Sequence, residues 1–488
     1  MSDEVPAAPA SPGSFPSLSI RANELSPRGS FAESQALYLR PDAETVAELD
    51  ALLKRTRAGV VAHFYMDPEL QGVLSACSWP YIHVSDSLAM ADAAVGMVEK
   101  GAERIVVLGV DFMSENVRAV LDAAGHESVP VHRVSAEAIG CSLAEAAESE
   151  AYLAYLDDAA EHPRALHVVY INTSLRTKAL AQVRVPTLTC TSGNVVRTIL
   201  QAAAEIPDVS IFFGPDTYMG ENLEVLFGSL AELGDDAIRA LHPAHDSRSL
   251  RALRERLHHF EQGNCVVHHM FGAEVVGLVR ADYPDAQVTA HLEVPGEMFA
   301  LGMRAQREGR GVIGSTSDIL AHIEAQTRLA MNASGARRLQ FVLGTEAGMV
   351  TPIVRRVQEI LREDEARDVE VEIVFPVASE AVAAAPDSPL GVVPGVAAGE
   401  GCTVAGGCAT CPYMKMNSLT SLLATLARDP SELTAFEPRK YLEKIERRSV
   451  AELGSEPILH MRHFSREGVM APALVQDVAT RYARRHAG

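Results

Sequence analysis

Three cysteines, Cys141, Cys265 and Cys411, stand 124 and 146 residues apart and could together hold a metal centre. Cysteine thiolates are the usual ligands of iron–sulfur clusters, and most such sites use four of them. Three thiolates would therefore leave one iron open to substrate or water. An open metal ion acts as a Lewis acid that polarises a carboxylate or hydroxyl group. The chemistry expected from this set is dehydration or condensation without net electron transfer.

The same cysteines also have simpler interpretations. Cys141 and Cys265 could each be a small buried hydrophobic residue, which is a common place for free cysteine. Cys411 and Cys408 form a C-x-x-C pair that could be half of a zinc site or a redox dithiol, and the sequence has no second such pair. Cys402 could be a ligand, a disulfide partner of Cys408 or an idle residue, and the idle or redox-modulatory interpretation is preferred over ligation. Two further cysteines fall at other places along the chain and are expected to be structural: Cys77 and Cys190.

Polar side chains end several short apolar runs. His63, Tyr170 and His291 each end such a run, at intervals of 107 and 121 residues. Open α/β sheets bind ligands at the carboxyl ends of their strands. A lone histidine there is more often a hydrogen-bonded core residue, but the recurrence favours a site. Hydroxyl residues also stand just after the next apolar run of each unit, and they could be helix caps or anion ligands. They are Ser87, Ser192, Ser315 and Thr316.

The elements that carry these residues repeat three times. Each unit consists of short apolar runs, turns of small or polar residues, and helical apolar patterns, which is typical of buried parallel strands alternating with helices. The last strand of the second unit is expected at residues 264–269. The predicted fold class is α/β, with three tandem homologous three-layer α/β/α domains. Their small parallel sheets are expected to lie about a pseudo-threefold axis with a central active site.

The predicted domain boundaries follow this repeat. Residues 1–44 are rich in Pro, Ser and Ala and are expected to form a disordered or loosely docked tail. The remaining segments are domain 1 at 45–149, domain 2 at 150–272, domain 3 at 273–425 with a Pro/Gly-rich insertion near 380–407, and a C-terminal helical segment at 426–488.

Composition limits the class of partner. The formal net charge is −21, which argues against nucleic acid or an anionic membrane, because basic patches find those surfaces. No run of eighteen apolar residues occurs, and the first residues lack the pattern of a signal peptide. An odd number of scattered cysteines is typical of reduced thiols. These features predict a cytoplasmic protein without membrane or nucleic-acid partners.

Ten short motifs occur in one order between residues 58 and 425. They are Ala62-His63-Phe64-Tyr65, Ser85-Asp86-Ser87-Leu88, Gly109-Val110-Asp111-Phe112-Met113, Tyr170-Ile171-Asn172-Thr173, Thr191-Ser192-Gly193-Asn194, Cys265-Val266-Val267-His268, Ala290-His291-Leu292-Glu293, Gly314-Ser315-Thr316, Gly344-Thr345-Glu346, and Cys411-Pro412-Tyr413-Met414-Lys415-Met416-Asn417. This series resembles the quinolinate synthase family of NAD biosynthesis. The resemblance implies an enzyme that condenses iminoaspartate with dihydroxyacetone phosphate to give quinolinate, two waters and phosphate.

The resemblance also implies a cofactor and roles for single residues. A 4Fe-4S cluster with one open iron would be held by Cys141, Cys265 and Cys411. The residues expected to bind the dicarboxylate substrate are His63, Ser87, Tyr170, Asn172, Ser192, His291, Glu293, Ser315 and Thr316. The residues expected to take part in catalysis are Glu293 as general acid or base, with His63, Tyr65 and His268. Arg176 and Lys178 are candidates to offset the negative field of the protein near anionic substrates.

The sequence departs from the family pattern at two places. His269 stands where the family often has an acidic residue, and Val294 stands where it often has a cysteine. Expected partners are the enzyme that produces iminoaspartate and the iron–sulfur assembly machinery. An alternative function is an iron–sulfur or thiol redox sensor on the same fold. A sensor would need the cysteines but would have no use for the substrate set.

Overall fold

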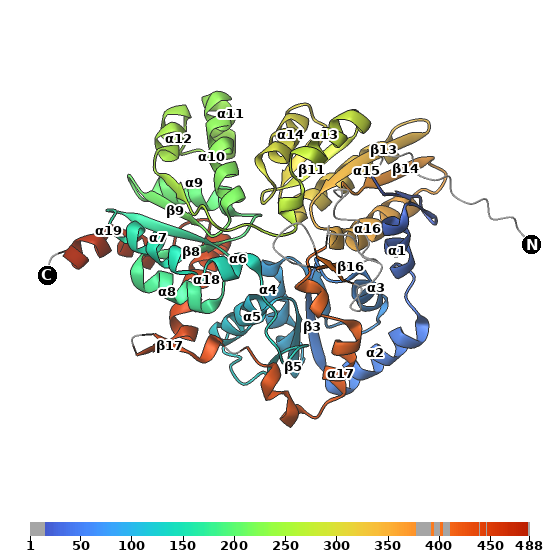
Figure 1. The fold of residues 1–488 in the computed structure, drawn as a ribbon, viewed down its shortest axis with the longest axis horizontal. Coiled ribbons are helices and arrows are strands. Elements are labelled where there is room, and N and C mark those ends of the chain that lie inside the picture. The colour runs from blue at the N-terminus through green and yellow to red at the C-terminus, as the bar shows by residue number, and fades with distance from the viewer. Residues whose placement is uncertain are drawn as a thin grey trace, which may run out of the picture. The chain divides into compact units, whose positions relative to one another are not determined.

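The computed structural model describes residues 15–376, 392–394, 401–403, 410–438, 440–445 and 447–486. The fold is mixed α/β, with several small, mostly parallel sheets flanked by helices (Figure 1). The chain divides into two compact units. Unit 1 comprises residues 1–52, 64–80 and 266–420, and unit 2 comprises residues 53–63, 81–265 and 421–488.

Unit 2 contains two four-stranded parallel sheets. The first has the order β4-β3-β5-β6. Its strands are β3 (Ala58–His63), β4 (Ile82–Ser85), β5 (Arg104–Leu108) and β6 (Val131–Arg133). The helices that follow its strands are α4 (Ser87–Glu99), α5 (Asp111–Ala123) and α6 (Ser142–Ala146). Every residue of β3 is buried, as expected for a strand covered on both faces.

The second sheet of unit 2 has the order β10-β9-β7-β8. Its strands are β7 (Ala165–Tyr170), β8 (Thr187–Cys190), β9 (Ser210–Gly214) and β10 (Leu257–His259). Its helices are α7 (Glu150–Ala160), α8 (Leu175–Arg184), α9 (Val195–Glu205), α10 (Thr217–Glu232), α11 (Asp235–Leu241) and α12 (Ser247–Arg254). The strand predicted at residues 264–269 is wrong, because the fourth strand is β10 and residues 268–270 form a 3₁₀ turn.

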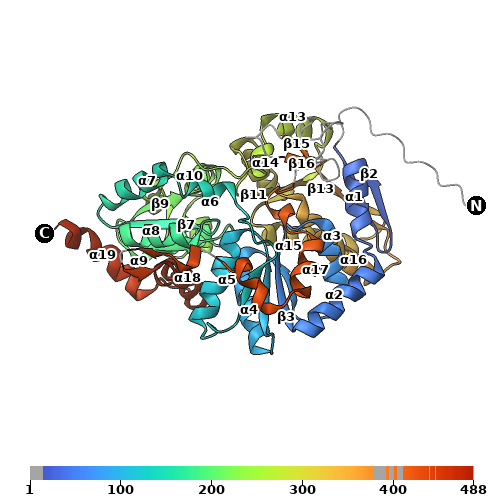
Figure 2. The ribbon, with the colours of Figure 1, turned by 60° about the horizontal axis from the view of Figure 1, so that its bottom comes forward.

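A long helix near the C-terminus, α18 (Val450–Glu467), packs on α8 and β8 (Figure 2). The two helices approach closely at Gly454, where an added Cβ would lie 2.4 Å from the carbonyl oxygen of Leu175. Only glycine fits this contact. The remaining elements of unit 2 are η5 (Pro430–Phe436), η6 (Lys440–Leu442), β17 (Lys444–Ile445), β18 (Arg448–Ser449) and α19 (Pro472–His486).

Unit 1 contains one six-stranded sheet of order β12-β11-β13-β14-β1-β2. Its four parallel strands are β11 (Gln287–His291), β12 (Gly311–Gly314), β13 (Arg337–Gly344) and β14 (Val369–Val374). The helices are α1 (Ser30–Tyr38), α3 (Pro68–Ala76), α13 (Ala273–Asp282), α14 (Gly296–Arg307), α15 (Thr316–Asn332), α16 (Val350–Arg362) and three 3₁₀ turns: η1 (His268–Met270), η2 (Ala347–Met349) and η4 (Met414–Met416). Two helices, α2 (Ala43–Thr56) and α17 (Leu419–Ala427), cross the boundary between the units.

The N-terminal segment corrects a prediction. Residues 1–44 were expected to be a loose tail, but β1 (Ser17–Ile20) pairs antiparallel with β14 and with β2 (Leu25–Arg28). Leu18 and Ile20 are fully buried, so the alternation in Ser-Leu-Ser-Ile places two aliphatic side chains in the core. Much of the predicted insertion near 380–407 lies outside the described residues, apart from a short antiparallel pair, β15 (Val392–Pro394) and β16 (Gly401–Thr403).

The three parallel sheets share one strand order. In each, the first strand in sequence lies between the second and the third, and the fourth lies beside the third. This agrees with a repeated unit, although the chain forms two compact units rather than three. The three-domain boundaries and the pseudo-threefold axis stay predictions.

Candidate active site

Three predicted substrate residues occupy the same position in their sheets. His63, Tyr170 and His291 are the last residues of β3, β7 and β11, which are the first strands of the three parallel sheets. Each pairs with the last residue of the neighbouring strand: Ser85, Cys190 and Gly314, respectively. The repeat inferred from spacing therefore corresponds to one register position at the carboxyl ends of the strands.

The hydroxyl residues follow the same register. Ser87, Ser192 and Thr316 each stand two positions after the paired residue. Ser315 lies one position earlier than this pattern. Its Oγ accepts the N–H of Asp318 and donates to that carboxylate at 2.7 Å, in a capping box that starts α15. The helix-cap interpretation thus accounts for Ser315, while Thr316 shares the repeated position.

A buried carboxylate lies between two histidines in unit 1. Oε2 of Glu293 is 3.1 Å from Nδ1 of His268, and Oε1 is 3.6 Å from Nδ1 of His291. Nδ1 of His291 also accepts the backbone N–H of Glu293, at 3.3 Å. The two imidazole rings stack with centroids 4.7 Å apart. His291 therefore holds the backbone of Glu293 in place, and His268 is the ring that can exchange a proton with the carboxylate.

Hydroxyl groups extend this network. Oγ1 of Thr345 lies 3.4 Å from Nε2 of His268 and 3.2 Å from the hydroxyl of Tyr65. Both ring nitrogens of His268 thus have polar neighbours, a carboxylate on one side and a hydroxyl on the other. Tyr65 and Glu293 are joined through His268 and Thr345 by groups that can donate and accept protons. Thr345 lies within one of the ten motifs, but its residue type and position did not indicate a role.

A second buried carboxylate, Glu346, adjoins this network in sequence. It accepts the backbone N–H of Cys411 at 2.9 Å and that of Gly348 at 2.8 Å. Burial raises the pKa of Glu346 to about 8, against the lowering effect of these two hydrogen bonds. Burial also lowers the pKa of Lys415, opposed by Asp67, Glu346 and Cys411. The Cys411 segment is therefore anchored to the end of β13, which the sequence analysis did not predict.

The three candidate ligand cysteines occupy equivalent places along the chain. Cys141, Cys265 and Cys411 each follow the fourth strand of a parallel sheet and precede a short helical turn: α6, η1 and η4, respectively. All three are partly exposed, as is Cys77, whereas Cys190 is buried. Cys402 lies in β16 without a described side chain, and Cys408 lies outside the described residues.

Two of these cysteines are brought together within unit 2. Oγ of Ser142, beside Cys141, donates to the carbonyl oxygen of Asn264, beside Cys265, at 2.9 Å. Gly263 lies against the α6 segment and the carbonyl of Pro215, where a side chain would not fit. Segments separated by 122 residues therefore meet at the two thiols.

The donor set around Cys265 fits a metal group. The thiol of Cys265, a ring nitrogen of His268 and a carboxylate oxygen of Glu293 all lie within 4.8 Å of one another. Cys265 ends unit 2, and His268 follows three residues later in unit 1. Thiolate donors are the ligands of iron–sulfur clusters, and a carboxylate–imidazole pair beside them is suited to proton transfer. The residues present thus fit a cluster beside a general acid or base.

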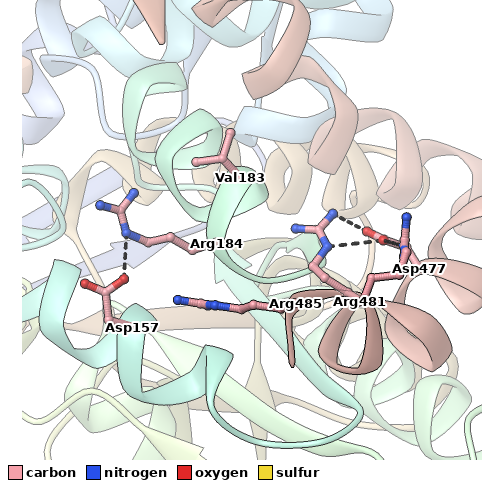
Figure 3. Close-up of a pocket in the computed structure, with 7 residues that line it drawn as sticks. Asp157, Val183, Arg184, Asp477, Arg481 and Arg485 are labelled. Carbon is pink, nitrogen blue, oxygen red and sulfur yellow. Dashed lines mark hydrogen bonds and ion pairs between the residues drawn. The ribbon is translucent and has the colours of Figure 1, made fainter. Parts of the chain in front are cut away.

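A separate pocket in unit 2 is rich in arginine (Figure 3). It has a volume of about 590 Å³, and its charged lining residues are Asp157, Arg184, Asp477, Arg481, Arg484 and Arg485. Arg184 pairs with Asp157, and Arg481 pairs with Asp477 while it donates to the Gln182 carbonyl near the end of α8. The Arg184 pair therefore links α8 to α7, and the contact of Arg481 with the Gln182 carbonyl links α19 to α8.

The chain is similar to a known protein family over most of its length. Residues 47–446 match the family described as quinolinate synthetase A protein. A chloroplastic quinolinate synthase of Nicotiana tabacum is 52% identical over 96% of the chain and 67% of its own length. The chain belongs to the quinolinate synthetase A family. Its function is that of the family, the synthesis of quinolinate, and it is an enzyme of NAD biosynthesis.

Two other relatives show the breadth of the similarity. The chloroplastic quinolinate synthase of Arabidopsis thaliana is 50% identical over 96% of the chain and 68% of its own length. The quinolinate synthase of Mycolicibacterium paratuberculosis is 29% identical over 65% of the chain and 74% of its own length. The chain spans about two-thirds of the length of the plant relatives.

The names of the plant relatives contradict the predicted cytoplasmic location, since these relatives are chloroplastic. That prediction was based on the lack of long apolar runs and of a signal-peptide pattern. Such properties describe a protein in any aqueous, reducing compartment and do not distinguish cytoplasm from plastid. Among the described residues, no helix is both long enough and apolar enough to cross a membrane.

Proposed function

We propose that this chain condenses iminoaspartate with dihydroxyacetone phosphate, with release of two waters and phosphate, and that Cys141, Cys265 and Cys411 hold a 4Fe-4S cluster. The observation that carries the proposal is the buried Glu293–His268 pair with the Cys265 thiol within 4.8 Å of both. When bound, the cluster would supply an open iron that polarises a carboxylate or hydroxyl group of the substrate.

Proton transfer is assigned to the network in unit 1. Each dehydration needs a proton on the departing hydroxyl and removal of a proton from carbon. Glu293 and His268 are both almost fully buried and 3.1 Å apart, so one proton can pass between them away from bulk water. Tyr65, joined to His268 through Thr345, is assigned with His63 to the proton movements of the triose.

The dicarboxylate is assigned to the carboxyl ends of the strands. His63, Tyr170 and His291 share one register position, and Ser87, Ser192 and Thr316 share another. Hydroxyl groups and backbone N–H groups at the starts of helices are suitable donors to carboxylates. Asn172 would add an amide. This recurrence supports the proposal that the three sheets surround one site about a pseudo-threefold axis.

The test is anaerobic purification followed by iron, sulfide and product analysis. About four irons and four sulfides per chain are expected, as one cubane cluster requires. The protein should form quinolinate from oxaloacetate, ammonia and dihydroxyacetone phosphate. A colourless, zinc-loaded and inactive protein would contradict the proposal.

A matched pair of variants tests the acid–base assignment. Glu293→Gln should abolish turnover and keep the iron content, because the amide fills the same space but cannot accept a proton. Glu308→Gln is the control, because Glu308 in unit 1 pairs with Arg304 and Arg310 on an exposed surface. Full activity in Glu293→Gln would overturn the assignment. A redox sensor would hold the cluster but form no quinolinate, even in the unaltered chain.

Two partners follow from this chemistry. An amino-acid-oxidising enzyme must supply the unstable imine, and iron–sulfur assembly proteins must deliver the cluster. Production of quinolinate from oxaloacetate and ammonia, without the supplying enzyme, would show that the imine can also arrive by diffusion.

A further inference from the structure

A fully buried lysine lies beneath the Tyr170–Asn172 segment of unit 2. Lys178 is on the first turns of α8 and has no exposed surface. Its Nζ donates to the carbonyl oxygens of Ile171 at 3.1 Å and Thr173 at 2.5 Å, and to Oγ1 of Thr173 at 3.0 Å. An ammonium group has three N–H donors, so all three are directed at this one turn.

Burying this charge is costly and is only partly offset. Burial lowers the pKa of Lys178 to about 7, while the buried Glu115 on α5 raises it. Glu115 itself accepts the backbone N–H of Leu175, the first residue of α8, at 2.7 Å. A neutral side chain of similar length would pack here without the desolvation cost. The ammonium therefore serves to hold the 171–173 turn by hydrogen bonds and is not needed for the packing of α8.

The turn is otherwise held by small contacts. Oγ1 of Thr173 donates to the carbonyl oxygen of Tyr170, and Ser174 caps α8 by accepting the N–H of Thr177. Asn172, between the two carbonyls that Lys178 binds, is only partly buried and makes no hydrogen bond within the described part of the chain. Its side chain and N–H are therefore available to a ligand.

The peptide group connects the lysine to Asn172. The carbonyl of Ile171 and the N–H of Asn172 belong to one peptide unit, so a cation on the oxygen polarises the N–H toward a stronger donor. A carboxylate at Asn172 would thus experience the buried charge through the backbone.

We propose that Lys178 is a positioning residue for the dicarboxylate substrate, which fixes the 171–173 turn and directs the Asn172 N–H and amide toward a substrate carboxylate. This inference rests on the proposed function, in which Tyr170 and Asn172 bind that substrate. Lys178 was a candidate to offset the negative field near the anionic substrates, and its ammonium is enclosed by the turn.

The test compares Lys178→Met with Gln182→Met. Gln182 lies one turn further along α8, is buried, and bonds Glu456 and the Thr187 N–H without touching the turn. Lys178→Met should raise KM for the imine about 10- to 100-fold, as expected for loss of a charged hydrogen-bond donor. The KM for dihydroxyacetone phosphate and the iron content should change less than about twofold. Gln182→Met should leave both KM values unchanged.

Hydrogen exchange gives a readout that does not need activity. Backbone amides of residues 171–174 should exchange faster in Lys178→Met than in the unaltered chain, and not in Gln182→Met. If the unaltered chain forms no quinolinate, the proposed function fails, while this measurement still decides whether Lys178 orders the turn. Unchanged exchange of the turn, or equal changes in both KM values, would overturn the inference.

A second variant covers the case in which Lys178→Met does not fold. Lys178→Arg keeps the charge but cannot place three donors on the same three oxygens. It should fold and raise KM for the imine alone. If Lys178→Arg left KM unaltered for both substrates, that result would contradict a positioning role.

Discussion

The two units each bury a histidine beside a hydroxyl, and the difference lies in the second partner. In unit 2, Nε2 of His167 is 2.8 Å from the hydroxyl of Tyr152, and Nδ1 is 3.4 Å from Oγ1 of Thr187. In unit 1, Nε2 of His268 also faces a threonine hydroxyl, but Nδ1 lies 3.1 Å from the carboxylate of Glu293. Of the two histidines, only His268 has a carboxylate as a partner.

The two histidines differ as a structural residue differs from the proposed catalytic one. Burial lowers the pKa of His167 to about 3, so its ring stays neutral and serves as a fixed hydrogen-bonding group. Tyr152 is fully buried among aromatic rings, including Phe260. Burial alone thus gives no reactivity. In the proposed mechanism, the carboxylate of Glu293, 3.1 Å from Nδ1 of His268, makes that histidine half of an acid–base pair.

The largest expected effect is on His268. His268→Gln keeps a hydrogen-bonding side chain but removes the ring that exchanges a proton with Glu293. We expect kcat for quinolinate formation to fall about 10²- to 10⁴-fold, the usual size of a general acid–base contribution, with iron content unchanged. His269→Gln is the control, because His269 is the exposed neighbour. Equal losses of kcat in His268→Gln and His269→Gln would contradict a specific role for His268.

Acid should weaken unit 2 through His167. The pKa of His167 is about 3 in the folded chain and about 6.5 when unfolded, so below pH 6.5 the unfolded state binds more protons. The free energy of unfolding should therefore fall by about 1.4 kcal/mol per pH unit between pH 6 and pH 4 from this residue. Hydrogen exchange in β7 measures it. His167→Gln should reduce this slope, and an unchanged slope would contradict a neutral buried ring.

The smallest expected effects are on stability and kcat when either of two tyrosines is replaced by phenylalanine. Tyr152→Phe removes the partner of His167 and should cost about 1 kcal/mol of stability, with kcat unchanged. Tyr65→Phe removes the hydroxyl near Thr345 and should lower kcat about tenfold or more, with little loss of stability. Urea unfolding and the quinolinate assay give the two readouts. If Tyr152→Phe lowered kcat as much as Tyr65→Phe, the two hydroxyls would not differ in role.

The sequence by itself determined the α/β class and most of the candidate residues. Apolar runs that end in His63, Tyr170 and His291 predict buried strands with polar carboxyl ends, because only a strand covered on both faces is apolar throughout. The similar spacing of these runs then predicts a shared register position, and the three strand pairings have it. The family membership was also predictable, since it depends on short motifs in one order.

Tertiary structure decided what depends on partners distant in sequence. The N-terminal Ser-Leu-Ser-Ile is too short to be recognised as a strand, and it becomes one because β14 offers an edge. Ser315 and Thr316 are indistinguishable by composition, and only the capping contact with Asp318 separates them. Glu346 meets Cys411, and Lys178 reaches the turn before its helix, only after the chain folds. A residue type sets the chemistry a group can perform, but the neighbours that fix its charge and orientation come from packing.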